Sequence, residues 1–350
     1  MAGKIRQYFR DRKDDVQDYT GGAGLLGKVV LAALVIWLLV ALVLGFFWSD
    51  EPETFSVRDN TRTVAESMGK EPVTGFATTS TLIRIADTLL EKPGGYLSND
   101  LMPPGLWLDN IPNWEYGVLV QIRDLTRAMR RDIARSQSQS SEDPDLVVAE
   151  PQFNFDSNSW AIPSTESEYR AGIKALRSYL GRLSSQGPNA AVFYARADNL
   201  GNWLADLETR LGSLSRNLSE SVGKASVSED MAEEGSGNET TSSISDTEVK
   251  TPWTKVDDVF YEARGSAWAL LHIFKAIEID FHKVLQDKNA MASVQQIIIE
   301  LQGTQEPMWS PVILNGSGFG LLANHSLTMA AYLSRANAAI SDMRDLLSRG

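Results

Sequence analysis

Residues 256–284, VDDVFYEARGSAWALLHIFKAIEIDFHKV, carry apolar side chains at alternating intervals of four and three residues. The pattern starts at Val256, continues through Phe260 and Phe274, and reaches Val284 without a break. A mean spacing of 3.5 residues places these side chains along one face of an α-helix and suits packing against similar helices. The stretch therefore predicts a long helix within a helical bundle.

The same spacing recurs in three other stretches, residues 169–183, 193–218 and 322–347. Shorter amphipathic segments surround residues 82–90 and 116–133. No stretch alternates convincingly between apolar and polar residues, so few or no strands are expected. We predict an all-α fold, an elongated antiparallel bundle with coiled-coil-like packing.

Capping and turn residues mark the expected helix ends. Thr165 and Glu168 are spaced as a capping box, and Asn324 precedes the last helix as a capping residue. The sequence Gly187-Pro188-Asn189 predicts a tight turn, so the helices on either side of it are expected to pack as a hairpin.

Residues 29–48 form an uncharged apolar run of twenty residues. At about 1.5 Å per residue this run spans roughly 30 Å, the thickness of a bilayer core. The alternatives are a cleaved signal peptide and a buried core helix. Phe46, Phe47 and Trp48 stand where a cleavage site needs small residues, and the run has no polar face. The pattern favours a retained single-pass anchor.

Charges near the run predict its orientation. Residues 1–28 hold six Lys and Arg, whereas the first twenty residues after the run hold only Arg58 and Arg62. The positive-inside rule places residues 1–28 in the cytoplasm, as a tail, and exports residues 49–350. We expect a linker at 49–72 and a periplasmic helical domain at 73–350, attached to the inner membrane.

Composition narrows the classes of function. The chain has no Cys, which is compatible with an oxidising compartment. Its net charge is −12, and removing the first 28 residues leaves −14, so we predict no nucleic-acid partner. Residues 219–251 hold eight Ser, eight acids and no aromatic residue, which predicts a disordered insert.

Residue patterns typical of catalysis or metal binding are weak. The three His are His272, His282 and His325; Glu278 precedes His282 by four residues, which does not match a di-iron bundle motif. The Gly-rich run at 315–320 lacks the Lys of a phosphate-binding loop. We predict no catalytic, cofactor-binding or metal-binding residues.

Two aromatic loops do not fit the bundle pattern. Residues 101–117 combine two Trp, three Pro and an Asp-Asn pair; residues 153–163 have a similar character and are expected to pack nearby. Trp side chains suit recognition surfaces, although they equally suit a cap on the core. A row of Arg on the helix after Asn113 is either a docking surface or a solvated face paired with acids. The candidate partner-binding residues are Trp107, Asp109, Asn110, Trp114, Glu115, Trp160, Arg127 and Arg131.

At these loops the sequence resembles a family of uncharacterised bacterial single-pass membrane proteins, domain of unknown function 2333. The resemblance rests on residues 94–100, 104–115, 135–140 and 160–169. It implies a proteobacterial inner-membrane protein and no known mechanism.

Three functions remain open at the level of sequence. The favoured one is a non-enzymatic interaction or scaffold module that binds an envelope protein, possible also as a homo-oligomer. The second is a sensor or carrier of a small molecule or lipid, because inward Ala263, Ala267, Ser326 and Ala336 leave room between helices. The third is a cell-wall hydrolase using Asp109 and Glu115.

Overall fold

A computed structural model describes residues 2–135, 141–222, 251–310, 312–316 and 321–349. Within these residues the chain forms helices and no strand, which confirms the all-α prediction. In the described ranges, eleven α-helices follow one another as α1 (Ala2–Trp48), α2 (Val57–Met68), α3 (Phe76–Glu91), α4 (Asn110–Ala128), α5 (Pro144–Phe153), α6 (Thr165–Leu183), α7 (Ala197–Glu220), α8 (Val256–Asp280), α9 (His282–Asp287), α10 (Met291–Gly303) and α11 (His325–Ser348). Short 3₁₀ turns cover Gly105–Trp107 and Trp253–Lys255, and a π-helical turn, Met129–Ile133, extends α4.

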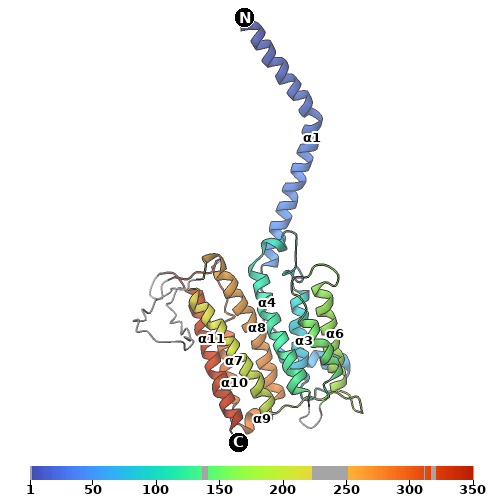
Figure 1. Cartoon of the computed structure of the whole chain (residues 1–350), viewed down its shortest axis with the longest axis vertical. Helices are drawn as coiled ribbons and strands as arrows, with labels where there is room; N and C mark the ends of the chain where they lie inside the picture. Colours follow the sequence, from blue (N-terminus) through green and yellow to red (C-terminus); the bar gives the residue numbers. More distant parts are fainter. Residues whose placement is uncertain (1, 136–140, 223–250, 311, 317–320, 350) are drawn as a thin grey trace, which may run out of the picture.

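Helix α1 leaves one end of a domain built by the other helices (Figure 1). Its segment Leu26–Trp48 is long and apolar enough to cross a membrane, with a mean hydropathy of 3.1. Only 11% of this apolar stretch is buried, and Leu31 and Leu42 are both more than half exposed. The segment is therefore not a core helix of the domain.

Helix α8 is the centre of the domain. All of its residues from Ala263 to Phe274 are buried, including Trp268 and Leu271 outside the predicted stripe. An α-helix that is apolar all round needs neighbours all round, and α3, α4, α7, α10 and α11 contact it. The predicted single helix over 256–284 is interrupted at Phe281, which separates α8 from α9.

Helices α4 and α8 form the closest pair and run in the same direction. Asn113 donates a hydrogen bond to Asp258, and Ser266, about two turns further along α8, donates to the carbonyl of Gly117, one turn further along α4. A Cβ atom on Gly117 would overlap the backbone of Glu262, so this glycine permits the close approach. The bundle is therefore mixed in direction, which differs from the purely antiparallel expectation.

The hairpin predicted around Gly187-Pro188-Asn189 is wrong. Helix α6 packs on α3 and α5, whereas α7 packs antiparallel to α11, with Ser215 bonded to Ser334 and Glu208 paired with Arg344. The connection between them is held extended across the domain, because the N–H of Tyr194 donates to the carbonyl of Ile133 at 2.8 Å.

The helix caps agree in part with the sequence. Asn324 accepts a hydrogen bond from the N–H of Leu327 at 2.8 Å, as predicted. Helix α6 is capped by Ser164 and not by Thr165, whose hydroxyl donates to two carbonyls of the preceding loop. Residues 223–250, most of the predicted insert, lie outside the described residues, while Ser219 and Glu220 belong to α7.

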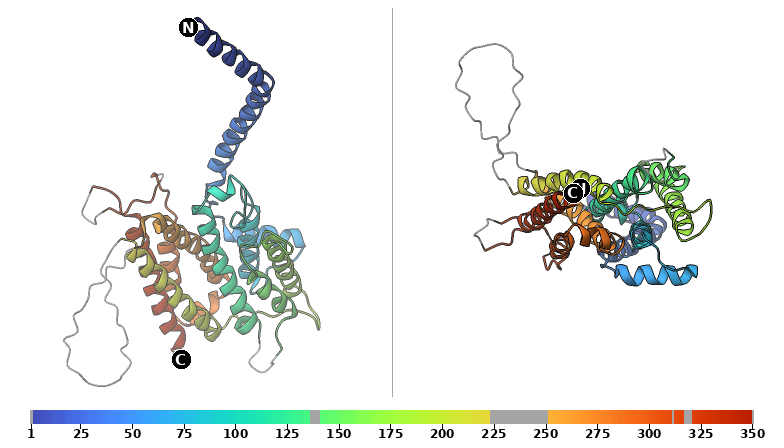
Figure 2. Two further views of the ribbon diagram at one scale, coloured as in Figure 1. Left: turned by 45° about the horizontal axis from the view of Figure 1, so that its top comes forward. Right: turned by 90° about the horizontal axis from the view of Figure 1, so that it is seen from below.

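The segment 49–72, expected as a linker, is an ordered part of the domain. Residues 49–56, here called the strap, lead from α1 to α2 along the surface of α8. Helix α2 packs on α3 at the edge of the domain (Figure 2) and buries Val57, Thr61 and Ala65. These three residues recur every four positions and form a short apolar stripe.

We expect Gly117→Ala to lower the free energy of unfolding by about 1–3 kcal/mol, because the added methyl meets backbone that cannot rotate away. Gly201→Ala in α7 is the matched control, since its Cβ meets nothing within 4 Å; it should gain about 0.5–1 kcal/mol. Urea unfolding of the full chain in detergent micelles measures both changes, and equal effects would contradict the close α4–α8 contact.

Candidate functional site

The structure places Glu115 in the second turn of α4, with no exposed surface. Its carboxylate pairs with Lys92 and accepts hydrogen bonds from the backbone N–H groups of Leu97 and Ser98, each at 2.9 Å. Burial raises the pKa of Glu115, while Lys92 opposes this shift by stabilising the carboxylate. Glu115 therefore anchors residues 92–99 to α4, which corrects its prediction as a partner-binding or reacting acid.

Trp114 is also buried, and this corrects its prediction as a surface residue. Its ring lies 5.2 Å from the ring of Trp268 at the centre of the α4–α8 contact. Trp107 and Trp160, in contrast, are 49% and 65% exposed. The sequence could not separate these roles, because all three stand in irregular or helix-starting segments.

Residues 96–99, which directly precede the first aromatic loop, contact the second aromatic loop. The side-chain amide of Asn99 donates to the carbonyl of Ser159 at 2.9 Å and to Glu166 at 3.0 Å. The hydroxyl of Tyr96 donates to the carbonyl of Ser157 at 3.0 Å. Both loops therefore lie at the end of the domain nearest α1.

Asp109 and Asn110 begin α4 beside these loops. The exposed Asp109 accepts a hydrogen bond from the N–H of Asn110, and Asn110 is partly buried. Asp109 and Glu115 do not face a common cleft as an acid pair, because Glu115 is enclosed by its own partners.

The Arg row on α4 is mostly used within the domain. Arg127, with a side chain 35% exposed, lies 3.4 Å from Asp124 and 3.9 Å from Glu150. Arg130 pairs with Glu142 and Glu150 at 2.8 and 2.9 Å. Arg131 is exposed.

The strap is fastened to α8 at two points. Arg264, whose side chain is 9% exposed, binds Glu51 at 2.6 Å and also donates to the carbonyls of Thr304 and Glu306. Two turns along α8, the ring of His272 stacks on Phe55 with centroids 3.9 Å apart. Helix α1 is therefore joined through the strap to the centre of the domain.

His272 is buried and fully hydrogen-bonded in its neutral form. Its Nε2 accepts from the N–H of Phe55 at 2.9 Å, and its Nδ1 lies 2.7 Å from the carbonyl of Trp268, which assigns the proton to Nδ1. Burial lowers the pKa of His272 from 6.5 to about 4. A second proton would have to displace the N–H of Phe55.

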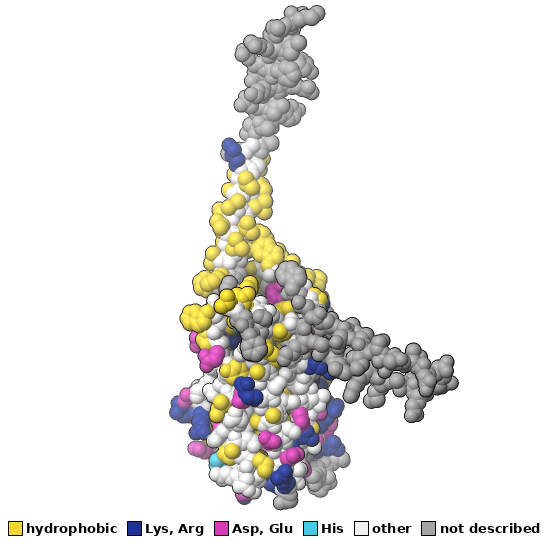
Figure 3. Space-filling view, turned by 90° about the vertical axis from the view of Figure 1, so that its left-hand side faces the viewer, with side chains coloured by type: hydrophobic (Ala, Val, Ile, Leu, Met, Phe, Trp, Pro, Cys, Tyr) yellow, Lys and Arg dark blue, Asp and Glu magenta, His cyan; other side chains and the backbone are white. Residues whose placement is uncertain are grey.

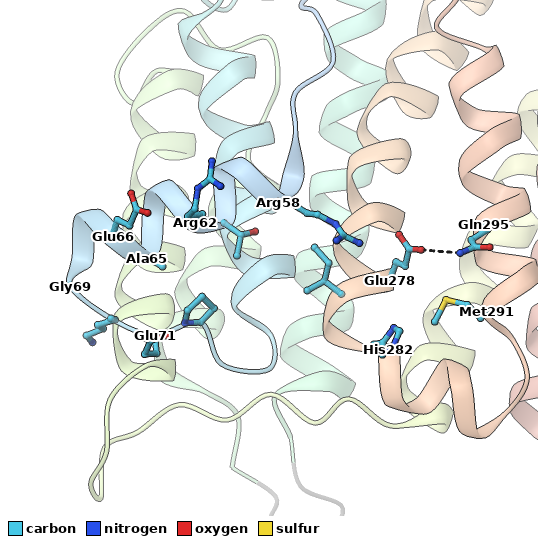
Figure 4. A pocket seen from close by; sticks show the side chains of 14 residues that line it. Arg58, Arg62, Ala65, Glu66, Gly69, Glu71, Glu278, His282, Met291 and Gln295 are labelled. Atoms are coloured by element: carbon cyan, nitrogen blue, oxygen red, sulfur yellow. Dashed lines mark hydrogen bonds between the residues drawn. The ribbon is translucent and has the colours of Figure 1, made fainter.

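A groove of about 1100 Å³ opens between α2 and the ends of α8 and α10 (Figure 4). Basic and acidic side chains line it, together with apolar Ile279 and Met291. Its charged or ionisable members are Arg58, Arg62, Lys70, His282, Glu66, Glu71 and Glu278. Glu278 near the end of α8 and His282 at the start of α9 thus line the same groove as two Arg from α2. Glu278 accepts a hydrogen bond from the side-chain amide of Gln295.

None of the sequence-predicted site residues lines this groove. Arg58 and Arg62 were missed because residues 49–72 were interpreted as a linker. A signal existed: Ser56 caps α2 by accepting from the N–H of Asp59, and Gly69 ends it in the left-handed conformation at φ 61°. In the described part of the chain no group of three or more His, Asp and Glu is placed to hold a metal ion. Residues 317–320 of the Gly-rich run lie outside the described residues.

Glu115→Gln should lower the free energy of unfolding by about 3–5 kcal/mol, because it leaves the ammonium of Lys92 buried without its counter-charge. Adding Lys92→Met should restore part of that loss. Asp109→Asn makes the same chemical change at an exposed cap and should be nearly neutral. Urea unfolding measures all three; a small effect of Glu115→Gln alone would contradict the anchoring role.

The protein should lose stability in acid through His272. Between pH 6.5 and about 4 the unfolded chain protonates His272 whereas the folded protein does not, so the free energy of unfolding falls as pH falls. The contribution is on the order of 3 kcal/mol across that window. His272→Gln should flatten this part of the pH profile, while the exposed His282→Gln should leave it in place. Unfolding curves recorded from pH 7 to 4 test this, and parallel profiles for wild type and His272→Gln would refute it.

Comparison with known proteins places the chain in a family. A family described as an uncharacterized protein conserved in bacteria, domain of unknown function 2333, matches residues 23–350. No curated protein and no solved structure matches the chain. The matched residues include most of α1, the strap, both aromatic loops and the groove, so the chain belongs to the family of domain of unknown function 2333.

Proposed function

We propose that this protein is a non-enzymatic docking module of the bacterial envelope, held at the inner membrane by α1 with its N-terminus in the cytoplasm and its helical domain in the periplasm. The docking surface is the groove between α2, α8 and α10. The observation that carries the proposal is the strap, which joins the apolar helix to the groove through ordered contacts.

Retention of α1 is supported by its packing. A cleaved signal peptide has no reason to fit the mature domain, yet Gly45 and Trp48 of α1 lie against Pro104 and Gly94 of the domain. The excess of Lys and Arg before the span supports the orientation.

The strap gives the groove a defined position. Arg264 and His272 fasten the strap to α8, and Glu278 of the groove lies on the same helix, about 20 Å beyond Arg264 at 1.5 Å per residue. A partner that occupies the groove is thereby held at a set distance from the bilayer.

The lining of the groove suits a polypeptide that carries both charges. Arg58 from α2 points across the groove toward Glu278, whereas Arg62 on the same helix points away from Glu278 (Figure 4). Ile279 and Met291 add apolar surface to the lining. Opposed charges around an apolar centre favour one orientation of a bound segment. The partner we expect is a protein segment with acidic residues positioned for Arg58 and Arg62.

The alternative functions have weaker support. Ala263, Ala267, Ser326 and Ala336 are all fully buried, as close helix packing requires, and so give no specific support to a carrier. A hydrolase using Glu115 conflicts with the enclosure of that side chain.

Arg58→Glu combined with Arg62→Glu should reduce capture of the partner by at least about tenfold, or ~1.4 kcal/mol, through charge repulsion. The measurement is photo-cross-linking from position 295 of the full-length protein in its own host, followed by identification of the cross-linked proteins. Arg170→Glu with Arg216→Glu is the matched control, because both Arg are exposed elsewhere on the domain. If both double variants cross-link like wild type, or if no protein is captured, the groove is not the docking surface.

A further inference from the structure

One face of α1 is covered by the domain along half of the apolar segment. Trp37, Ala41, Gly45 and Trp48 are spaced by four, four and three residues and so share a helix face. Ala41 is 3% exposed and Gly45 is buried, whereas Leu34 on the same helix is 56% exposed. The two small residues leave a shallow track between the two Trp rings.

The 3₁₀ turn of the first aromatic loop fills this track. The ring of Trp107 packs edge-on to the ring of Trp37 with centroids 6.1 Å apart. A Cβ atom on Gly45 would lie 3.4 Å from that of Pro104. Trp37 is the central residue of Leu26–Trp48 and lies about 16 Å along the helix from Trp48. The loop therefore reaches the level of the middle of the apolar segment.

The loop has the composition of a segment that contacts lipid. Residues 101–108 read LMPPGLWL and contain no charged or polar side chain; Asp100 and Asp109 stand at its two ends. Leu101, Met102 and Leu106 are 55%, 70% and 59% exposed, so they are not used to cover the track.

The backbone of the loop also suits a medium without water. Pro103 and Pro104 have no N–H group, and the N–H groups of Leu106, Trp107 and Leu108 donate to carbonyls within the loop. Five of the eight residues thus present no free donor. This matters because unsatisfied backbone groups are costly in hydrocarbon.

We propose that residues 101–108 enter the bilayer beside α1 and contact phospholipid acyl chains through Leu101, Met102 and Leu106. If α1 spans the membrane, as the proposed function holds, the level of Trp37 lies inside the hydrocarbon core, and Trp107 lies there with it. The loop is then a second membrane element. The residues that lead into it are held to α4 by the ion pair of Lys92 with Glu115.

The surrounding surface is consistent with this placement. Hydrophobic side chains gather along α1 and at the end of the domain that it leaves, while most charged side chains on the visible face lie farther away (Figure 3). Exposed Trp160 and Ile162, in the neighbouring loop tied by Asn99, belong to this end. Arg264 binds the carbonyls of Thr304 and Glu306, so the segment with exposed Trp309 starts here too. These side chains suit the headgroup region.

The test uses the absence of native Cys. Single substitutions Leu106→Cys, Met102→Cys, Leu34→Cys and Lys283→Cys are made in the full-length chain, labelled with an environment-sensitive fluorophore, and reconstituted in phosphatidylcholine nanodiscs with or without acyl-chain nitroxide lipids. Leu34 reports on α1, and Lys283 in α9 reports on the far end of the domain. The loop positions are largely exposed, so a label there should leave the fold intact.

The expected result is blue-shifted emission and loss of most fluorescence to the nitroxide at positions 34, 102 and 106, with no quenching at 283. The quenching should not change with salt concentration, because the contact is apolar and the domain is acidic. Quenching at 34 without quenching at 102 and 106 overturns loop insertion but leaves the anchor intact. Lack of quenching at 34 overturns the anchor, and the loop proposal falls with it. A blue shift at position 106 that depends on dimer formation and occurs without nitroxide quenching would show that a second copy of the chain covers the loop. That result also overturns lipid contact.

Discussion

The guanidinium of Arg264 is the contact on which the arrangement of the parts depends. It stands in the central helix, almost fully buried, and binds the carboxylate of Glu51 in the strap together with two carbonyls after α10. A buried Arg is tolerated only when its donors are used. The need to satisfy this one charge therefore fixes the exit of α1, the end of α10 and the middle of α8 relative to one another.

The long helices were predictable because a helix that buries one face needs apolar residues at regular intervals, and this spacing is visible in the sequence. Helices α3, α4, α6, α7, α8 and α11 all coincide with predicted amphipathic stretches. It missed α2, α5 and α10, which are short. In α5 the internal Pro151 disguises the helix, although Asp143 and Pro144 form an ordinary start. Which helices are neighbours was not predictable, since heptads of similar composition fit several partners; hence the hairpin of α6 and α7 was wrong.

Site prediction failed where it depended on depth below the surface. Trp107 and Trp114 are seven residues apart, yet one is half exposed and the other has no exposed surface, because the start of α4 turns only the second toward Trp268. Residue type alone could not show that the carboxylate of Glu115 is buried and that of Asp109 exposed. The groove could not be predicted from the sequence for a different reason. Its two walls come from residues 58–72 and 278–295, and no local sequence pattern indicates that segments so far apart lie together.

The parallel contact of α4 with α8 has a mechanical consequence. Gly117 lets the backbones of α4 and α8 approach closely at Ser266, and both helices start at the end of the domain that carries α1. Two helices in such close contact cannot slide past each other without losing it. A displacement of one of them should therefore move the other with it, so that the far end of the domain follows the end that carries α1.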